Sequence, residues 1–217
     1  MDRLLGALRR VGIPLLGLGD LLANPASPGV ALTFDDGMRT VMTDALPVLR
    51  HHDTPAHLFL TTGAVGGNNR WPSQPVGAPT FAMLNWTEIE TLHRAGIHIE
   101  GHTVQHPDLR QLSDLQLLDE CDGADRVITE RFGRAPQFFA YPYGYHDQRV
   151  RQLLGPRYRA CLTTDVRMLR PGDGMSGLPR LESYYLRPEW LARHPSGALS
   201  RHYLALRAVL RRLRSWA

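Results

Sequence analysis

The chain has 217 residues, 43% of them hydrophobic, which is enough apolar material for one domain with a single core. Its positive charge comes from 25 arginines and no lysine, and because these are scattered until the C-terminus we expect no nucleic-acid partner. No apolar run reaches about 18 residues, so neither a membrane span nor a signal peptide is predicted. We expect a cytoplasmic location for the sequence as written, and a periplasmic or extracellular one if its true start lies upstream.

Strand-like and helix-like segments alternate along the chain, which favours a mostly parallel α/β architecture with a barrel as its closed form. The predicted strands are 30–34, 56–60, 97–100, 137–140 and 159–163. The predicted helices are 38–52, 87–95, 114–132 and 147–154. Two of them carry capping-box patterns, Thr87 with Glu90 and Ser113 with Gln116. Residues 63–79, rich in Gly, Pro and Asn, predict a long loop.

The first candidate site is the Asp35-Asp36-Gly37 segment, which closes the strand predicted at 30–34. Successive side chains on a strand point to opposite faces, so both carboxylates can serve one site only where the strand breaks. Gly37 supplies that break, because glycine adopts backbone conformations that other residues avoid. Alone, the doublet is ambiguous, since Asp-Asp-Gly is also a common surface turn.

A second motif, His102 and His106, follows the strand predicted at 97–100. The four-residue spacing would place both imidazoles on one face of a helical turn. With one carboxylate they make a three-ligand set that leaves a coordination position open for water, as in catalytic zinc sites. A lone His-x-x-x-His pair is more typical of a solvated helix face. Its position after a strand, together with the Asp-Asp-Gly segment, favours the metal site.

Three segments, at 33–37, 102–106 and 141–144, resemble in order the motifs of the polysaccharide deacetylases, the NodB-homology proteins of carbohydrate esterase family 4. The similarity runs from about residue 4 to about residue 189, and its motifs are specific together but weak singly. The segments 139–144 and 178–181 are most similar to the exopolysaccharide-associated branch. The resemblance implies a single-domain, distorted (β/α)7-type barrel and metal-dependent N-deacetylation.

The resemblance also implies a role for each matching residue. Asp35 is the expected base, and Asp36, His102 and His106 are the expected metal ligands. Tyr143 is the expected backbone N–H donor to the carbonyl oxygen of the substrate. Zinc is the first expectation for the metal, although nitrogen and oxygen ligands also admit cobalt, nickel or iron.

The chain departs from the wider family pattern two residues before the motif proline. An arginine usually stands there and holds the catalytic aspartate, whereas this chain has Ala140. In the exopolysaccharide-associated branch, an arginine in a Leu-Pro-Arg segment is a candidate substitute. This nominates Arg180 as the residue that orients Asp35.

The general acid, which would protonate the departing amine, is left unassigned. The wider family supplies it from a histidine in a Leu-x-x-His pattern, and this branch from a Tyr-His near the N-terminus that the printed sequence lacks. The Leu-x-x-His pattern occurs three times, ending at His52, His194 and His202. Three occurrences in one chain show how little the pattern specifies.

We divide the chain into a catalytic barrel, 1–199, and a basic amphipathic helix, 200–217. For this helix, packing of its apolar stripe on the barrel is favoured over contact with an anionic membrane or a partner. Peripheral membrane contact through it stays open, and the oligomeric state is not predicted.

The leading functional hypothesis is a metal-dependent hydrolase that removes N-acetyl groups from N-acetylhexosamine units of a polysaccharide or its precursor. An N-acetylated glycan is then the expected partner. Within the same chemistry, deacylation or deformylation of another acylated sugar stays open. The missing acid suggests an alternative, a metal-retaining glycan-binding protein with little or no turnover. A third hypothesis is a binder of anionic polymers or membrane surfaces that acts through the C-terminal arginines.

Overall fold

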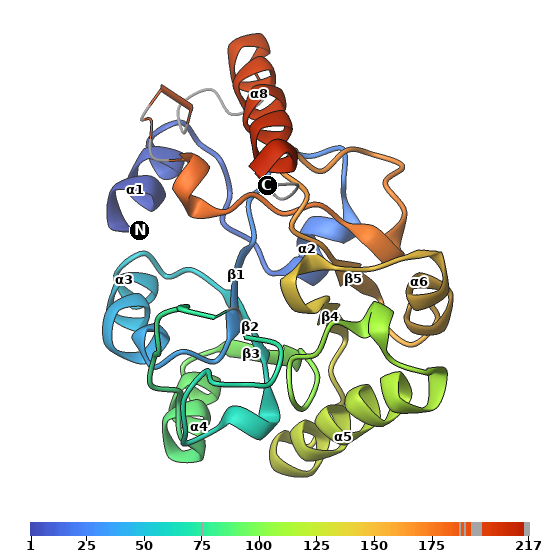
Figure 1. Cartoon of the computed structure of the whole chain (residues 1–217). Helices are drawn as coiled ribbons and strands as arrows, with labels where there is room; N and C mark the ends of the chain where they lie inside the picture. The colour runs from blue at the N-terminus through green and yellow to red at the C-terminus, as the bar shows by residue number, and fades with distance from the viewer. Residues whose placement is uncertain (75, 187, 189, 192–196, 215–217) are drawn as a thin grey trace.

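The structure is a computed structural model that describes every residue except 75, 187, 189, 192–196 and 215–217. Five parallel strands lie side by side in chain order and curl into a distorted barrel with helices around it (Figure 1). The strands are β1 (Leu32–Asp36), β2 (Ala56–Leu60), β3 (Ile97–Gly101), β4 (Phe138–Ala140) and β5 (Ala160–Leu162). The α-helices are α1 (Asp2–Arg10), α2 (Leu18–Ala23), α3 (Leu46–His51), α4 (Trp86–Arg94), α5 (Asp114–Phe132), α6 (Gln148–Leu154) and α8 (Ala198–Arg214). Short π- or 3₁₀-helical turns are η1 (Val41–Ala45), η2 (Thr62–Ala64), η3 (Leu109–Gln111), η4 (Pro142–Gly144), η5 (Met175–Gly177) and η6 (Ser183–Leu186).

Two single-residue bridges extend the barrel at its edges. Leu15 pairs in parallel with Val30, just before β1, and Leu178 pairs in parallel with Leu162 of β5. Each bridge therefore extends one edge of the five-stranded sheet by a single residue pair. The expected single-domain (β/α) barrel is confirmed in this distorted form.

Strand β2 shows how the barrel is covered on both faces. All five of its residues are buried. Leu58 and Leu60 face outward and pack in a cluster with Ile89 and Leu92 of α4. Phe59 faces inward and packs with Phe138 and other residues that fill the barrel. This alternation is the pattern expected where parallel strands are covered by helices.

The barrel interior also holds a buried polar pair, His57 and Glu100. The His57 Nδ1 lies 3.2 Å from the Glu100 carboxylate, and its Nε2 accepts from the Leu18 N–H at 2.9 Å. Glu100 also accepts from the backbone N–H groups of Gln137 at 2.8 Å and Phe138 at 3.1 Å. Strands β3 and β4 share only one register pair, so this carboxylate takes over bonds that the ladder would otherwise make.

The five predicted strands and four predicted helices are confirmed to within a few residues, with 38–52 divided between η1 and α3. The Ser113–Gln116 capping box is also confirmed. The Thr87–Glu90 box is wrong, because α4 begins two residues earlier. Its N-cap is Asn85, whose side chain accepts from the Glu88 N–H at 2.9 Å, while Glu88 accepts from the Asn85 N–H at 3.0 Å.

The C-terminal helix α8 packs beside the barrel through one of its sides. Leu204 is buried there with Val166, Tyr185 and Leu191. Among the residues that the structure describes, no helix is both long and apolar enough to cross a membrane.

Candidate active site

The carboxyl end of β1 presents two aspartates to one pocket. Asp36 has a φ of 71°, and Gly37 has a φ of 96°. The strand's alternation therefore breaks at Asp36, one residue earlier than the sequence indicates. Gly37 allows a close approach as well, since a Cβ there would lie 2.7 Å from the Leu60 Cδ1 atom.

Asp36, His102 and His106 converge on one point at the floor of this pocket. The Asp36 Oδ1 lies 3.3 Å from the Nε2 of each histidine. The His102 Nδ1 lies 2.7 Å from the Ala140 carbonyl oxygen and so donates to it, which leaves Nε2 turned toward the carboxylate. Two imidazole nitrogens and one carboxylate oxygen at this spacing fit a divalent metal ion.

The segment between the two histidines is a strained loop, so the predicted helical turn is wrong. Thr103 and His106 have φ values of 66° and 55°. The Glu120 carboxylate of α5 accepts from the N–H groups of Val104 and Gln105, at 3.0 and 2.8 Å. These bonds satisfy backbone N–H groups that the loop leaves without a backbone partner. The imidazoles meet because the loop folds back, and helical spacing plays no part.

Arg180 lies against Asp35 in a two-pronged ion pair. Its Nη1 and Nη2 each donate to one carboxylate oxygen at 2.7 Å, and its Nε donates to the Thr163 carbonyl at 3.0 Å. Burial alone would raise the pKa of Asp35, but the adjacent guanidinium outweighs it and lowers this pKa. The structure thus brings together the two residues that the Leu-Pro-Arg segment nominated, with Asp35 ionised.

The long loop after β2 builds one wall of the pocket, which has a volume of about 290 Å³. Trp71 of this loop packs on the imidazole of His106, with ring centroids 4.4 Å apart, and its Nε1 donates to the Tyr143 hydroxyl at 2.9 Å. Ser73 donates to the His106 carbonyl at 2.6 Å. The sequence predicts the loop. Nothing in it indicates that Trp71 would contact a candidate ligand, because that contact spans separate parts of the chain.

His106 differs from His102 in the hydrogen bonding of its Nδ1 atom, the ring nitrogen that faces away from Asp36. Among the described residues, its buried Nδ1 has no hydrogen-bond partner. Burial also lowers the pKa of His106, which favours the neutral imidazole that a metal requires. Metal-bound histidines usually have their ring held by a hydrogen bond from the second nitrogen. Here the packing of Trp71 and Tyr143 on the ring restricts its orientation instead.

The turn after β4 brings Tyr143 into the pocket lining beside Trp71. Tyr143 has a φ of 59°, and its carbonyl accepts from the Thr164 hydroxyl at 3.3 Å. The next residue must be small, since a Cβ on Gly144 would lie 2.2 Å from the Thr164 Oγ1 atom. Tyr143 and Thr164 both line the pocket.

The three Leu-x-x-His segments do not bring a histidine into the described pocket lining. His52 lies at the end of α3, and His202 is exposed on α8 with its Nδ1 2.8 Å from the Ala198 carbonyl oxygen. His194 lies outside the described residues. Besides Asp36, the carboxyl group that lines the pocket in the described part of the chain is Asp35.

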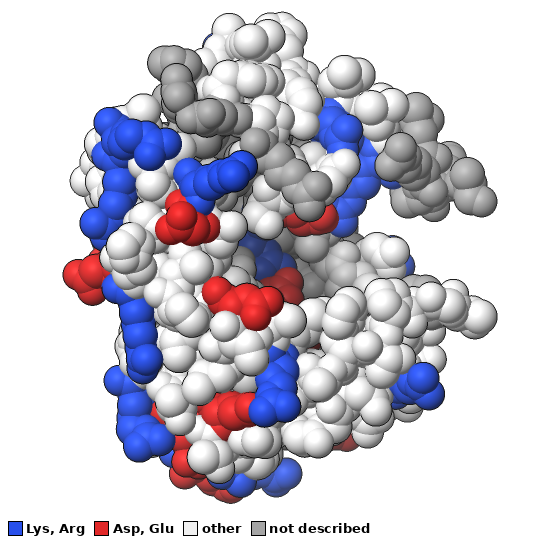
Figure 2. Space-filling model, turned by 90° about the vertical axis from the view of Figure 1, so that its left-hand side faces the viewer, with Lys and Arg blue, Asp and Glu red and all other residues white. Residues whose placement is uncertain are grey.

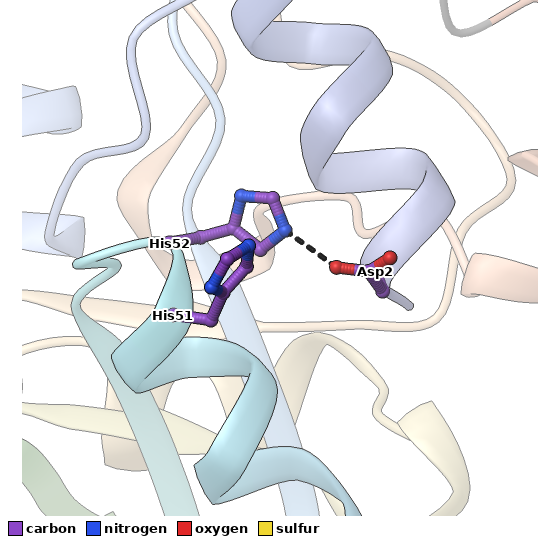
Figure 3. Close-up of side chains that lie close together, drawn as sticks. All are labelled: Asp2, His51 and His52. Carbon is purple, nitrogen blue, oxygen red and sulfur yellow. Dashed lines mark hydrogen bonds and ion pairs between the residues drawn. The ribbon is translucent and has the colours of Figure 1, made fainter.

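A second group of metal-binding side chains, Asp2, His51 and His52, lies away from this pocket (Figure 3). The His52 ring points toward Asp2, with 2.8 Å between Nε2 and Oδ1. Asp2 and His51 are exposed, and the Arg9 guanidinium bonds the His52 carbonyl. Positive charge close by disfavours a cation, so we interpret this contact as a hydrogen bond that joins α1 to the end of α3.

Comparison with known proteins gives three findings. The family profile described as polysaccharide deacetylase matches residues 23–155. A chitin deacetylase from Colletotrichum lindemuthianum is 31% identical over 134 residues, which are 61% of this chain and 46% of that protein. A poly-beta-1,6-N-acetyl-D-glucosamine N-deacetylase from Staphylococcus aureus is 25% identical over 162 residues, 70% of this chain and 53% of that protein. The chain thus spans about half the length of these curated relatives.

Solved structures with a similar fold include other deacetylases. IcaB from Ammonifex degensii superimposes with a TM-score of 0.72 at 24% identity, over 88% of this chain and 87% of that one. The profile match at 23–155 includes Asp35, Asp36, His102, His106 and Tyr143. Arg180 and α8 lie beyond it.

Proposed function

The chain belongs to the polysaccharide deacetylase family, and on that premise we propose that it is a metal-dependent hydrolase that removes N-acetyl groups from N-acetylhexosamine units of a glycan. The observation that carries the proposal is the convergence of Asp36, His102 and His106 beside an Asp35 carboxylate held by Arg180. Neither the three metal-binding side chains nor the Asp35–Arg180 pair would suffice alone, because the reaction needs both a cation site and a base next to it.

Asp36, His102 and His106 would hold the metal ion. Zinc suits two imidazoles and one carboxylate, and cobalt, nickel and iron are the alternatives that the same donors accept. When bound, a divalent ion would lower the pKa of water and polarise the acetamide carbonyl. The lone pairs of the two imidazole nitrogens and the carboxylate oxygen converge on one point, where a cation would balance them.

Asp35 would act as the base. It accepts a proton from the water that attacks the carbonyl carbon, and Arg180 keeps it ionised and in one orientation. Because Asp35 and Asp36 are the carboxyl groups in the described pocket lining, we propose that Asp35 also returns this proton to the amine nitrogen as the C–N bond breaks. The products are acetate and a free amine, and no separate acid is required.

Tyr143 would stabilise the negative charge that develops on the carbonyl oxygen, through its backbone N–H. Its left-handed conformation and the bond from Thr164 to its carbonyl hold the turn in place. The pocket walls also carry Trp71 and Phe81, whose rings suit the apolar faces of a sugar.

The substrate class rests on two supports. Both curated relatives described above are named for polymers of N-acetylglucosamine, and the pocket is lined by aromatic side chains that suit sugar rings. The linkage, the chain length and the acyl group are not specified by these observations. The proposal is therefore an N-acetylhexosamine polymer or its precursor, with deformylation or another deacylation of a sugar as the alternative.

The test is acetate release from β-1,4- and β-1,6-linked N-acetylglucosamine oligomers by metal-loaded protein, with bound metal quantified. Asp35→Asn should retain the metal and lose at least about a hundredfold in rate, whereas His102→Ala should lose both. Asp119→Asn, at an exposed position on α5, is the matched control and should behave like wild type. Metal-loaded protein that releases formate from N-formylated oligomers and no acetate would support the alternative. Retention of the oligomers without release of either acid would indicate a binding protein.

A further inference from the structure

The loop 102–106, which carries both candidate histidine ligands, has a backbone conformation that is costly for residues other than glycine. Thr103 and His106 both lie in the left-handed region, with φ values of 66° and 55°. Such residues persist only where the surrounding structure fixes them. One fixing contact comes from η2, where the Gly63 N–H donates to the Val104 carbonyl at 2.9 Å. The loop therefore depends on neighbouring elements for its shape.

Glu120 of α5 makes a charged contact to this loop. One of its carboxylate oxygens, Oε2, accepts from the Val104 N–H at 3.0 Å and from the Gln105 N–H at 2.8 Å. Successive N–H groups beside a left-handed residue form a concavity that suits an anion, and hydrogen bonds to a charged acceptor are stronger than neutral ones. Since Gly63 binds the Val104 carbonyl, Val104 is held at both its N–H and its C=O group.

Helix α5 is also shaped to approach the loop closely. Gly123 lies three residues after Glu120 and so on the same side of the helix. A Cβ at Gly123 would lie 2.9 Å from the Val104 Cγ2 atom, so a larger residue would push the helix and the loop apart. Glycine inside a helix is destabilising relative to alanine, and here it permits the close approach. Two positions on one side of α5 thus contact the same loop residue.

Other acidic side chains of α5 have ordinary surface partners. Asp114 pairs with Arg149, and Asp122 pairs with Arg157, with both aspartates exposed. Figure 2 shows the same arrangement on one face of the molecule, where acidic side chains lie beside arginines at the surface. Exposed pairs of this kind contribute little to stability. The partly buried carboxylate of Glu120 binds backbone groups of the loop instead.

We propose that Glu120 is a positioning residue for the metal centre. By binding the N–H groups of two consecutive loop residues, it holds His102 and His106 where both rings reach the same point before a metal ion binds. A ligand set that is already in place binds more tightly, because less of the chain has to be ordered on binding. The role of Glu120 rests on the proposed function, since it presupposes that the two histidines are metal ligands.

The test is titration of metal-free protein with Co²⁺, followed by the visible absorption of the bound ion. Glu120→Leu removes the acceptor and keeps a strong helix former, and it should weaken Co²⁺ binding at least about tenfold. Glu120→Gln removes the charge but keeps an acceptor oxygen, and its affinity should stay within about threefold of wild type. Glu130→Leu, the same substitution at an exposed position of α5, is the matched control and should bind like wild type.

Circular dichroism of the metal-free variants checks that each is folded. If Glu120→Leu does not fold, Glu120→Asp replaces it, because aspartate keeps the charge but withdraws the oxygens from the loop by one methylene group. This variant should also bind Co²⁺ about tenfold more weakly than wild type.

Two results would overturn the role of Glu120 alone. One is a folded Glu120→Leu or Glu120→Asp variant that binds Co²⁺ as tightly as wild type. The other is a Glu120→Gln variant that binds as weakly as these, since charge rather than position would then decide the affinity. Wild type that bound no Co²⁺ would overturn the metal site itself, and with it both the proposed function and the role of Glu120.

Discussion

Asp125 carries a specific prediction about how stability depends on pH. It lies on α5, where its Oδ2 accepts from the Tyr158 hydroxyl at 2.8 Å. Among the described residues, its buried Oδ1 has no partner. Burial raises the pKa of Asp125 to about 6, above the ordinary value of 3.8, although the Tyr158 bond and the nearby Arg157 oppose the shift.

Proton binding decides whether Asp125 stabilises the folded state at low or at high pH. Because the folded pKa is raised, the folded state holds the proton more tightly than the unfolded state does. This stabilisation is fully present below pH 3.8 and is lost as the pH rises through 6. A difference of about two pKa units corresponds to about 3 kcal/mol, of which about 2 kcal/mol would be lost between pH 4.5 and 8.

Asp125→Asn isolates this contribution, because asparagine keeps an acceptor for Tyr158 and cannot ionise. We expect the free energy of unfolding of wild type to fall by about 2 kcal/mol relative to Asp125→Asn over that pH range. Urea unfolding followed by circular dichroism at several pH values measures it. Asp119→Asn, exposed on the same helix, should track wild type. Parallel stability curves for wild type and Asp125→Asn would refute the reasoning.

Two further predictions concern the catalytic pocket. Arg180→Met should lower kcat by about tenfold to a hundredfold with little change in KM, because Asp35 loses its orientation and no group that binds the glycan is removed. Arg180→Lys should recover only part of the rate, as measured by acetate release, because one ammonium cannot make the two-pronged pair. Trp71→Ala should weaken metal binding about tenfold in a calorimetric titration, since the His106 ring loses the packing that holds it. Equal affinities for wild type and Trp71→Ala would assign Trp71 to the glycan alone.

The barrel was predictable because each strand is a short apolar run, and three of them, β1, β3 and β4, end in a site motif. In β1 and β3, the residues that leave the strand are the ones that carry the chemistry, as in other parallel barrels. The pairing of Arg180 with Asp35 came from the family resemblance. Their separation of 145 residues carries no periodic signal, although the structure places them 2.7 Å apart.

The conformation of 102–106 was not predictable from spacing, because the deciding contact comes from another element. A His-x-x-x-His pair is equally compatible with a helix and with a loop that folds back. Glu120 of α5 selects the loop by binding the N–H groups of Val104 and Gln105. The Thr87 box failed for a related reason, since Asn85 offers the same chemistry two residues earlier and keeps an extended backbone with ψ of 169°.

The orientation of α8 shows what hydrophobic periodicity leaves undetermined. The helix has an apolar residue on almost every side, and its pattern is compatible with burying either Leu204 or Leu206. Polar contacts decide between them. Arg211 lies on the same side as Leu204, and it can reach Thr164 and Glu182 only if that side faces the barrel. In this orientation Arg211 supplies the Thr164 carbonyl with a charged donor, which the opposite orientation would remove. The face that carries Leu204 and Arg211 therefore packs on the barrel, and the face that carries Leu206 and Leu210 stays exposed.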